Sequence, residues 1–368
     1  MLLAHLIAIQ VIVPSDNLSP RIPLFFPNLF HYMSRLVHVS ADDAGYRRKG
    51  RGKGFEYFDE KGKKITSKDQ LDRIIRLHIP PAWKNVWISP NPEGHLQATG
   101  LDSRARKQYL YHEEWNKQSQ INKFDRMAAF ARILPDLRKR ISQDLRKEGW
   151  PREKVISLVI SILDQNSLRI GNKMYENENG TYGLTTLKRK HLKVEDDGIS
   201  FQFKAKGGLP SKTKIRGKKL TRLVLECSEL PGQEIFQYLD EEQKTHPVFS
   251  NDVNAYIQEI TGGEFTAKDF RTWSGTVWAL VLFPEAVVEM ELSKNKSLAT
   301  NIVRKVAEKL GNTIAVCRAY YIHPSILSVA EMDPTEFDKL EERALSKYKD
   351  LKDVLNPSEI TALYLIEK

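Results

Sequence analysis

Two segments decide how this sequence is interpreted: Lys268-Asp269-Phe270-Arg271-Thr272-Trp273, and Leu310-Gly311-Asn312-Thr313 followed by the pair Tyr320-Tyr321. Together they supply an arginine, a side-chain amide and a phenol. A phenolic oxygen can attack phosphorus, and fixed donors stabilise the extra negative charge of the phosphorane that forms. Arginine suits that role because its planar guanidinium stays charged and can hold two phosphate oxygens. The two segments therefore predict transfer of a phosphodiester to a tyrosine.

The composition agrees with a polyanionic partner. Lysine and arginine total 57 against 47 acidic residues, and the pI is about 9.3. This surplus suits nucleic acid, although an anionic membrane surface would also attract it. The two cysteines, Cys227 and Cys317, give neither a disulfide framework nor zinc-ligand spacing, so a reducing cytoplasm is the expected compartment. No run of about 18 apolar residues predicts a transmembrane helix.

The chain is expected to begin with an extension and a small domain. Residues 1–32 hold one basic residue, one acidic residue and four prolines, without the features of a signal peptide. We interpret them as a loosely attached extension or a mis-set start, with a packed arm or a targeting segment as alternatives. Residues 33–119 predict a domain rich in short strands, among them 86–89, 96–100 and 107–111. In the expected strand 107–111, side chains alternate between two faces, so Gln108 lies on the face opposite to Tyr109 and Tyr111.

Residues 120–368 predict a larger and mainly helical domain. Apolar residues recur at three- and four-residue steps through 124–137, and a second long helix is expected over 151–168. Three short strands are expected at 183–187, 191–195 and 199–204. Asp333-Pro334 and Asn356-Pro357 are typical starts of the last two helices.

The two opening segments resemble the active site of the type IB DNA topoisomerases, in particular the short poxvirus-like and bacterial branch. The resemblance extends over about residues 33–368. It implies an α+β fold in which a small β-rich domain and a larger helical catalytic domain form a clamp on duplex DNA. It also implies relaxation of supercoils through a 3′-phosphotyrosyl intermediate, by a monomer that needs neither ATP nor an obligatory metal.

The resemblance assigns the nucleophile to Tyr321, because the family places its tyrosine nine residues after the position of Asn312. Tyr320 is the alternative, and only one of two neighbouring phenols can face the phosphate. Arg271 and Arg169 match the two arginines of the family. A surface ion pair for Arg271 and a helix C-terminal contact for Arg169 are the other readings.

The general acid and the last donor are matched less closely. Lys206 corresponds to the lysine that the family carries on a hairpin, although Ala205 replaces the usual glycine and Lys204 is a competitor. Such a lysine can protonate a leaving 5′ oxygen if nearby cations lower its pKa; a plain phosphate contact is the alternative. Asn312 stands where poxvirus-type enzymes have histidine. It can donate to a phosphate oxygen without titrating, or it can simply end a helix.

Candidate DNA contacts come from three places. Gln108, Tyr109 and Tyr111 match a Gln-Tyr-x-Tyr string that contacts DNA in poxvirus-like relatives, although an ordinary strand would explain them too. Tyr175 matches a family tyrosine six residues after Arg169. A basic cluster is expected to form a flexible phosphate-binding loop, with a merely solvated loop as the alternative. Its members are Arg47, Arg48, Lys49, Arg51 and Lys53.

Two other functions use similar residues. Tyrosine recombinases exchange strands with similar catalytic groups, but they usually carry histidine where this chain has Lys268, and the stretch from Arg271 to Asn312 is longer than expected for them. An architectural DNA-binding protein would need the basic strings but not Tyr321.

Overall fold

The structure is a computed structural model that describes residues 36–52, 54–103, 105–263, 265–292 and 297–368. The predicted extension, residues 1–32, and Lys53 lie outside these ranges. The chain divides into two compact units. The first comprises the described residues up to Pro81 with Asn85–Gly100 and Tyr109–Trp115, and the second comprises Ala82–Lys84, Leu101–Gln108 and Asn116–Lys368.

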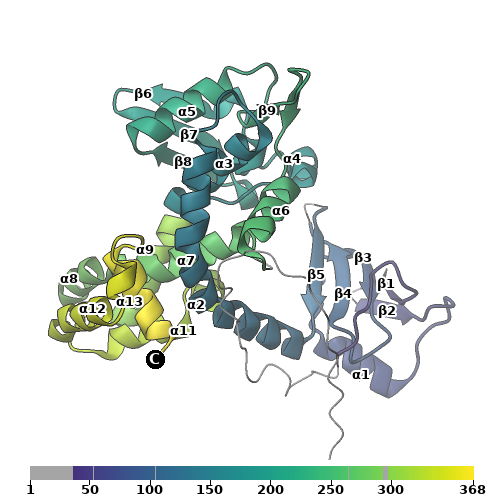
Figure 1. Ribbon diagram of the computed structural model, residues 1–368. Coiled ribbons are helices and arrows are strands. Elements are labelled where there is room, and N and C mark those ends of the chain that lie inside the picture. The colour runs from purple at the N-terminus through teal and green to yellow at the C-terminus, as the bar shows by residue number, and fades with distance from the viewer. Residues whose placement is uncertain (1–35, 53, 104, 264, 293–296) are drawn as a thin grey trace, which may run out of the picture. The chain divides into compact units, whose positions relative to one another are not determined.

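The first unit is built on a five-stranded sheet of order β2-β1-β3-β4-β5 (Figure 1). Its elements are β1 (Tyr46–Arg51), β2 (Gly54–Phe58), α1 (Lys68–Arg76), β3 (Lys84–Ile88), β4 (Leu96–Leu101) and β5 (Lys107–Tyr111). The strands predicted at 86–89, 96–100 and 107–111 are confirmed. Polar contacts fix α1 on the sheet: Arg73 Nη2 donates to Gln97 Oε1 at 2.7 Å, and Gln70 Nε2 donates to the Tyr46 hydroxyl at 3.0 Å.

The predicted basic loop is instead a strand, so that expectation was wrong. β1 pairs with the aromatic strand β2 in an antiparallel register that sets Arg47 opposite Phe58 and Lys49 opposite Glu56. The rings of β2 support the cations of β1: Arg48 Cζ lies 4.1 Å from the ring centroid of Phe55. Pairing satisfies the backbone groups of a segment that charge alone would keep in solvent.

The second unit combines helices with two small sheets. Its long helices are α2 (Glu113–Asp144), which begins in the first unit, α3 (Arg152–Asn166), α5 (Lys218–Ser228), α6 (Ser250–Thr261), α7 (Ala267–Val281), α8 (Phe283–Leu292), α9 (Leu298–Leu310), α12 (Thr335–Lys347) and α13 (Pro357–Ile366). Shorter helices are α4 (Lys173–Asn179), α10 (Ile314–Tyr320), α11 (Pro324–Leu327) and the 3₁₀ turns η1 (Leu184–Thr186), η2 (Arg189–His191), η3 (Lys206–Gly208), η4 (Ser328–Glu331) and η5 (Lys349–Leu351). The sheets are β6-β7-β8 (Leu192–Glu195, Gly198–Lys204, Pro210–Ile215) and β9-β10 (Gln237–Leu239, Thr245–Pro247). The α+β class predicted from the sequence is confirmed.

One predicted strand, 183–187, is a 3₁₀ turn. Here the backbone N–H of Leu184 donates to the carbonyl of Arg169 at 2.9 Å, and Thr186 Oγ1 donates to the carbonyl of Gly183 at 3.0 Å. A Cβ on Gly183 would lie 2.5 Å from the backbone of Gly171, so the two chain segments approach closely. The strand prediction for this segment was therefore wrong, and the turn buries Leu184 and Leu187, which are three residues apart.

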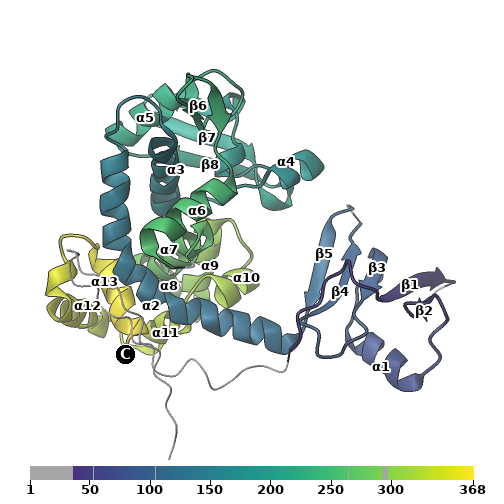
Figure 2. The same ribbon diagram turned by 45° about the vertical axis from the view of Figure 1, so that its right-hand side comes forward.

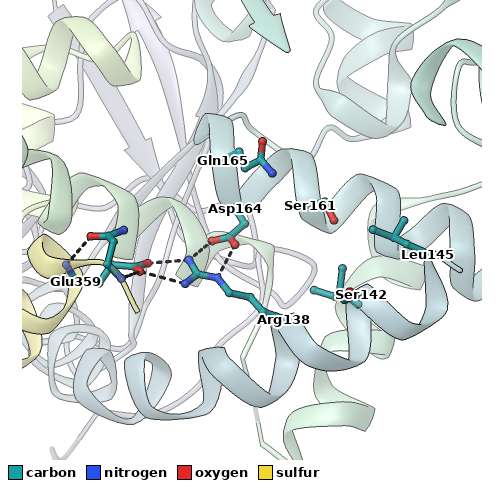
Figure 3. Close-up of a pocket in the computed structure, with 9 residues that line it drawn as sticks. Arg138, Ser142, Leu145, Ser161, Asp164, Gln165 and Glu359 are labelled. Carbon is teal, nitrogen blue, oxygen red and sulfur yellow. Dashed lines mark hydrogen bonds and ion pairs between the residues drawn. The ribbon is translucent and has the colours of Figure 1, made fainter. Parts of the chain in front are cut away.

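Helix α7 lies in the middle of the second unit, packed against α3, α9 and α13 (Figure 2). Most of its residues are buried, among them Phe270 and Trp273. Figure 3 shows how α13 is fixed: Arg138 of α2 bridges Asp164 of α3 and Glu359 of α13. The indole Nε1 of Trp273 donates to the same Glu359 at 3.2 Å. The helix that carries KDFRTW is therefore held from several directions.

Candidate active site

Arg271 is a buried cation in the second turn of α7. It is 6% exposed, and its guanidinium donates to the backbone carbonyls of Ser167 and Leu310. Burial, together with the neighbouring charge of Arg169, lowers its pKa to about 10. A guanidinium with that pKa is still protonated at neutral pH. The predicted surface ion pair is not what this arginine forms.

Arg169 follows the end of α3 and turns toward the loop after α9. Ser167 ends α3 in the left-handed conformation, with φ of 53°, earlier than the predicted end at 168. Nη2 of Arg169 donates to Oδ1 of Asn312 at 2.5 Å and to the carbonyl of Gly311 at 3.4 Å. Burial lowers the pKa of Arg169, while Tyr321 nearby acts in the opposite direction. The hydrogen-bond partners of the Arg169 side chain thus lie in the loop after α9 and not on α3.

Asn312 serves both the fold and the site. Gly311 ends α9 with φ of 59°, and the backbone N–H of Asn312 donates to the carbonyl of Ala307 at 2.9 Å. Its amide oxygen is held by Arg169. The amide nitrogen Nδ2 is buried and has no hydrogen-bond partner among the described residues, and the same is true of Nε of Arg271. Two buried donors therefore remain available beside the tyrosines.

The structure distinguishes Tyr321 from Tyr320. Helix α10 ends at Tyr320, whose side chain is 42% exposed, and Tyr321 is the first residue beyond it, with φ of −130°. The ring of Tyr321 packs against the core. Cζ of Arg271 lies 5.2 Å from its centroid. Tyr321 therefore lies against the arginine.

The main chain at Tyr321 is fitted closely to α7. A Cβ on Gly275 would lie 2.4 Å from the carbonyl oxygen of Tyr321, which explains a glycine inside this buried helix. Thr276 Oγ1 donates to that carbonyl at 3.5 Å and accepts from the backbone N–H of His323 at 3.1 Å. A side chain at position 275 would displace the tyrosine.

Lys206 lies apart from these contacts. It begins the turn η3 between β7 and β8, and its side chain is exposed, as is that of Lys204. Gly207 and Gly208 continue the turn with φ of 85° and 81°. In the part of the chain that the structure describes, Lys206 forms no hydrogen bond or ion pair with Arg169, Arg271, Asn312 or Tyr321. Its assignment as general acid stays a prediction.

The candidate DNA contacts differ in how exposed each side chain is and in which neighbours it contacts. Tyr109 and Tyr111 are exposed on β5 and stack with centroids 6.2 Å apart, while Gln108 donates to Asp102 at 2.9 Å. Tyr175 on α4 is 49% exposed. Arg48 is bound within the unit, since it donates to the carbonyls of Ile79 and Pro80.

Arg47, Lys49 and Arg51 of the basic strand are exposed. Arg51 pairs with Glu56 at 2.6 Å, and Nζ of Lys49 lies 4.9 Å from the ring centroid of Phe58. In the part of the chain that the structure describes, no helix is both long and apolar enough to cross a membrane. The same part holds no group of three His, Cys, Asp or Glu side chains arranged for a metal ion.

Sequence reasoning missed one residue that touches the tyrosine pair. Lys123 of α2 donates from Nζ to the carbonyl of Tyr320, and Nζ lies 4.9 Å from the ring centroid of Tyr321. In the sequence Lys123 is one polar residue in an amphipathic helix, so no pattern marked it.

Comparison with known proteins gives the same result as the geometry. Residues 112–347 match the family described as eukaryotic DNA topoisomerase I, catalytic core, and residues 54–102 match the bacterial DNA topoisomerase IB N-terminal domain. DNA topoisomerase 1B of Acanthamoeba polyphaga mimivirus is 32% identical over 299 residues, covering 79% of this chain and 89% of that protein. DNA topoisomerase 1B of Vaccinia virus (strain Copenhagen) is 25% identical over 240 residues, covering 63% and 71%.

The chain belongs to the type IB DNA topoisomerase family and is, on that ground, an enzyme of the isomerase class. The family, the fold class and the enzymatic function predicted from the sequence are thereby confirmed.

Proposed function

We propose that Tyr321 is the nucleophile of a reversible transesterification that relaxes supercoiled duplex DNA. Its phenolic oxygen attacks the scissile phosphorus, the bond from phosphorus to the 5′ oxygen breaks, and a 3′-phosphotyrosyl link forms. The free strand swivels, and its 5′ hydroxyl then attacks the same phosphorus and expels the tyrosine. The number of phosphodiester bonds is conserved, so the reaction needs no ATP. Fixed cationic donors would stabilise the phosphorane, so we propose no obligatory metal.

The observation that carries this proposal is the convergence of three donors beside Tyr321 from three separate segments. Arg271 lies over the ring, and Arg169 and Asn312 are joined by a hydrogen bond next to it. The unpartnered Nε of Arg271 and Nδ2 of Asn312 are suited to receive nonbridging oxygens. These donors would stabilise the phosphorane, because they are fixed in place and partly screened from water.

Lys206 completes the proposed chemistry as the general acid. It would give its proton to the departing 5′ oxygen and recover one from the 5′ hydroxyl during religation. Its exposed place on the β7–β8 turn requires the turn to meet the DNA. Basic neighbours on the same hairpin, such as the exposed Lys204, would contact phosphates.

The proposed substrate is duplex DNA, bound by a monomer in the cytoplasm, on the nucleoid if the cell is bacterial. In the first unit, Tyr109, Tyr111, Gln108 and the exposed basic residues of β1 are the proposed contacts; in the second, Tyr175 is. We propose that both units grip the duplex, with boundaries near 33–119 and 120–368. Residues 1–32 contribute no proposed contact.

One experiment separates the competing functions. Purified protein is incubated with positively and with negatively supercoiled plasmid, in EDTA and without ATP. We expect relaxation of both plasmids and a covalent adduct on the 3′ side of the nick that maps to Tyr321. Strand exchange without processive relaxation would indicate a recombinase. Binding without any adduct would indicate an architectural protein.

A further inference from the structure

Lys123 reaches the tyrosine pair from a helix far away in the sequence. It lies in α2, 197 residues before Tyr320, and its ammonium donates to the Tyr320 carbonyl. The same nitrogen lies 4.9 Å from the ring centroid of Tyr321 and 5.3 Å from that of Phe124. Phe124 in turn meets the ring of His323 edge-on, with centroids 5.3 Å apart. Two successive residues of α2 therefore contact residues before and after Tyr321 in the sequence: Lys123 contacts Tyr320, and Phe124 contacts His323.

The surroundings of Lys123 are those of a built contact. Burial, with a smaller effect of the neighbouring charge of Lys268, lowers its pKa to about 7 against the opposing effect of Asp269. Asp269 also accepts from the N-terminal backbone of α7 and lies 3.8 Å from Arg126. An amine at this depth would be costly without a partner, and the carbonyl of Tyr320 supplies one in either protonation state.

The carbonyl that Lys123 holds belongs to the peptide plane shared with Tyr321. Fixing that oxygen fixes the orientation of the plane, and with it the direction in which the Tyr321 side chain leaves the main chain. On the other side, Gly275 and Thr276 fix the next carbonyl, that of Tyr321 itself. The two peptide planes flanking the phenol are thus held by two different helices.

We propose that Lys123 is a positioning residue that holds Tyr321 in its attacking orientation. The proposal rests on the proposed role of Tyr321 as nucleophile. By anchoring the preceding peptide plane, Lys123 keeps the phenol on the side of Arg271.

The test compares Lys123→Met, which removes the donor and the charge, with Lys123→Arg, which keeps both. Lys139→Met is the matched control, because Lys139 is an exposed lysine on the same helix. Single-turnover cleavage is measured at saturating DNA. Noncovalent affinity is measured with each change placed in a Tyr321→Phe background. If Lys123→Met does not fold, as judged by circular dichroism, Lys123→Ala, which also lacks the donor and the charge, replaces it.

We expect Lys123→Met to lower the saturated cleavage rate by about 10-fold to 100-fold, because small misplacements of a nucleophile have effects of this order. Lys123→Arg should recover most of the rate, and Lys139→Met should match the wild type. Affinity should change no more for Lys123→Met than for Lys139→Met.

Three results would overturn the proposal. These are an unchanged saturated rate for Lys123→Met, a loss confined to DNA affinity, which would make Lys123 a phosphate contact, and a Lys123→Arg variant as slow as Lys123→Met. A covalent adduct formed by Tyr321→Phe would instead refute the proposed nucleophile. The two failures are therefore distinguishable.

Discussion

The amide oxygen of Asn312 accepts a hydrogen bond from Nη2 of Arg169 at 2.5 Å. This contact fixes the orientation of the amide, because only its oxygen can accept. Its nitrogen is then directed to the buried space where it has no partner among the described residues. Arg169 therefore orients the amide of Asn312.

Asn312→Asp tests the direction of that amide. A carboxylate keeps an acceptor for Arg169 but replaces the free donor by a second acceptor. We expect the thermal unfolding midpoint to be retained and single-turnover cleavage at neutral pH to fall about 100-fold to 1,000-fold, the usual effect of losing one fixed donor to a developing charge. Asn312→Ala, which loses both contacts, is the comparison. A cleavage rate like that of the wild type in Asn312→Asp would show that the amide does not donate to the phosphate.

Tyr321→Phe should abolish relaxation and covalent trapping while leaving noncovalent DNA binding nearly intact. The ring and its contact with Arg271 are preserved, and only the attacking oxygen is removed. Tyr320→Phe is the matched control, because the Tyr320 side chain is exposed whereas that of the next residue, Tyr321, packs against the core. Both variants are assayed by denaturing gel after trapping on labelled duplex. The reverse pattern, in which only Tyr320→Phe loses the adduct, would move the nucleophile by one residue.

Lys206→Ala should slow cleavage strongly on ordinary DNA. A substrate with a 5′-bridging phosphorothiolate should restore much of the rate, because sulfur leaves without a proton donor. Lys204→Ala, on the same turn, is the control and should not be rescued selectively. Single-turnover rates on the two substrates give the comparison. If Lys204→Ala is rescued and Lys206→Ala is not, the general acid is Lys204.

Arg271, Asn312 and Tyr321 could be assigned from the sequence because they lie in short local motifs that resemble those of the family. Their catalytic roles stay predictions. Lys123 acts through a tertiary contact to a backbone carbonyl. A carbonyl has no residue identity, so no pair of letters in the sequence reports that contact.

The same distinction explains the errors in the fold. The basic cluster was predicted to be a loop because its charge is typical of a solvated segment. In the structure residues 47–51 instead pair with the aromatic strand β2. The segment 183–187 was expected to be a strand, but the glycines at 171 and 183 bring two backbones together and the chain forms a 3₁₀ turn there. In both cases contact with another segment of the chain, and not the local residue pattern, determined the backbone.

The basic residues of β1 should differ in their effect on DNA binding. Arg47 and Lys49 are exposed, so Arg47→Ala combined with Lys49→Ala should flatten the slope of log affinity against log salt by up to about 0.9 per lost phosphate contact. Arg48→Ala is the control. Its guanidinium is occupied by the carbonyls of Ile79 and Pro80, so the slope should stay unchanged while the unfolding midpoint falls. An unchanged slope in the double variant would favour a merely solvated strand. The cleavage rate at saturating DNA should be unaffected in either case.

Glu359→Gln should destabilise the second unit in a pH-dependent way. Glu359 accepts from Arg138 at 2.7 Å (Figure 3). It also accepts from Trp273 at 3.2 Å and from the backbone N–H of Asn356 at 3.0 Å. The glutamine amide would turn a donor toward groups that are themselves donors. Removing one partner of a buried ion pair typically costs about 3 kcal/mol or more, and we expect a loss of that order in the free energy of unfolding at neutral pH.

The pH dependence of this loss follows from the pKa of Glu359. Burial alone would raise it, but the hydrogen bonds and charge of Arg138 lower it on balance. A carboxyl with a lowered pKa contributes stability above its unfolded pKa of about 4.3, and that contribution is lost as pH falls through the folded value. Urea unfolding of wild type and Glu359→Gln should therefore converge in acid and separate at neutral pH. Glu342→Gln, an exposed glutamate on α12, is the control and should show no such separation. A constant difference at all pH values would mean that the loss comes from packing and not from the ion pair.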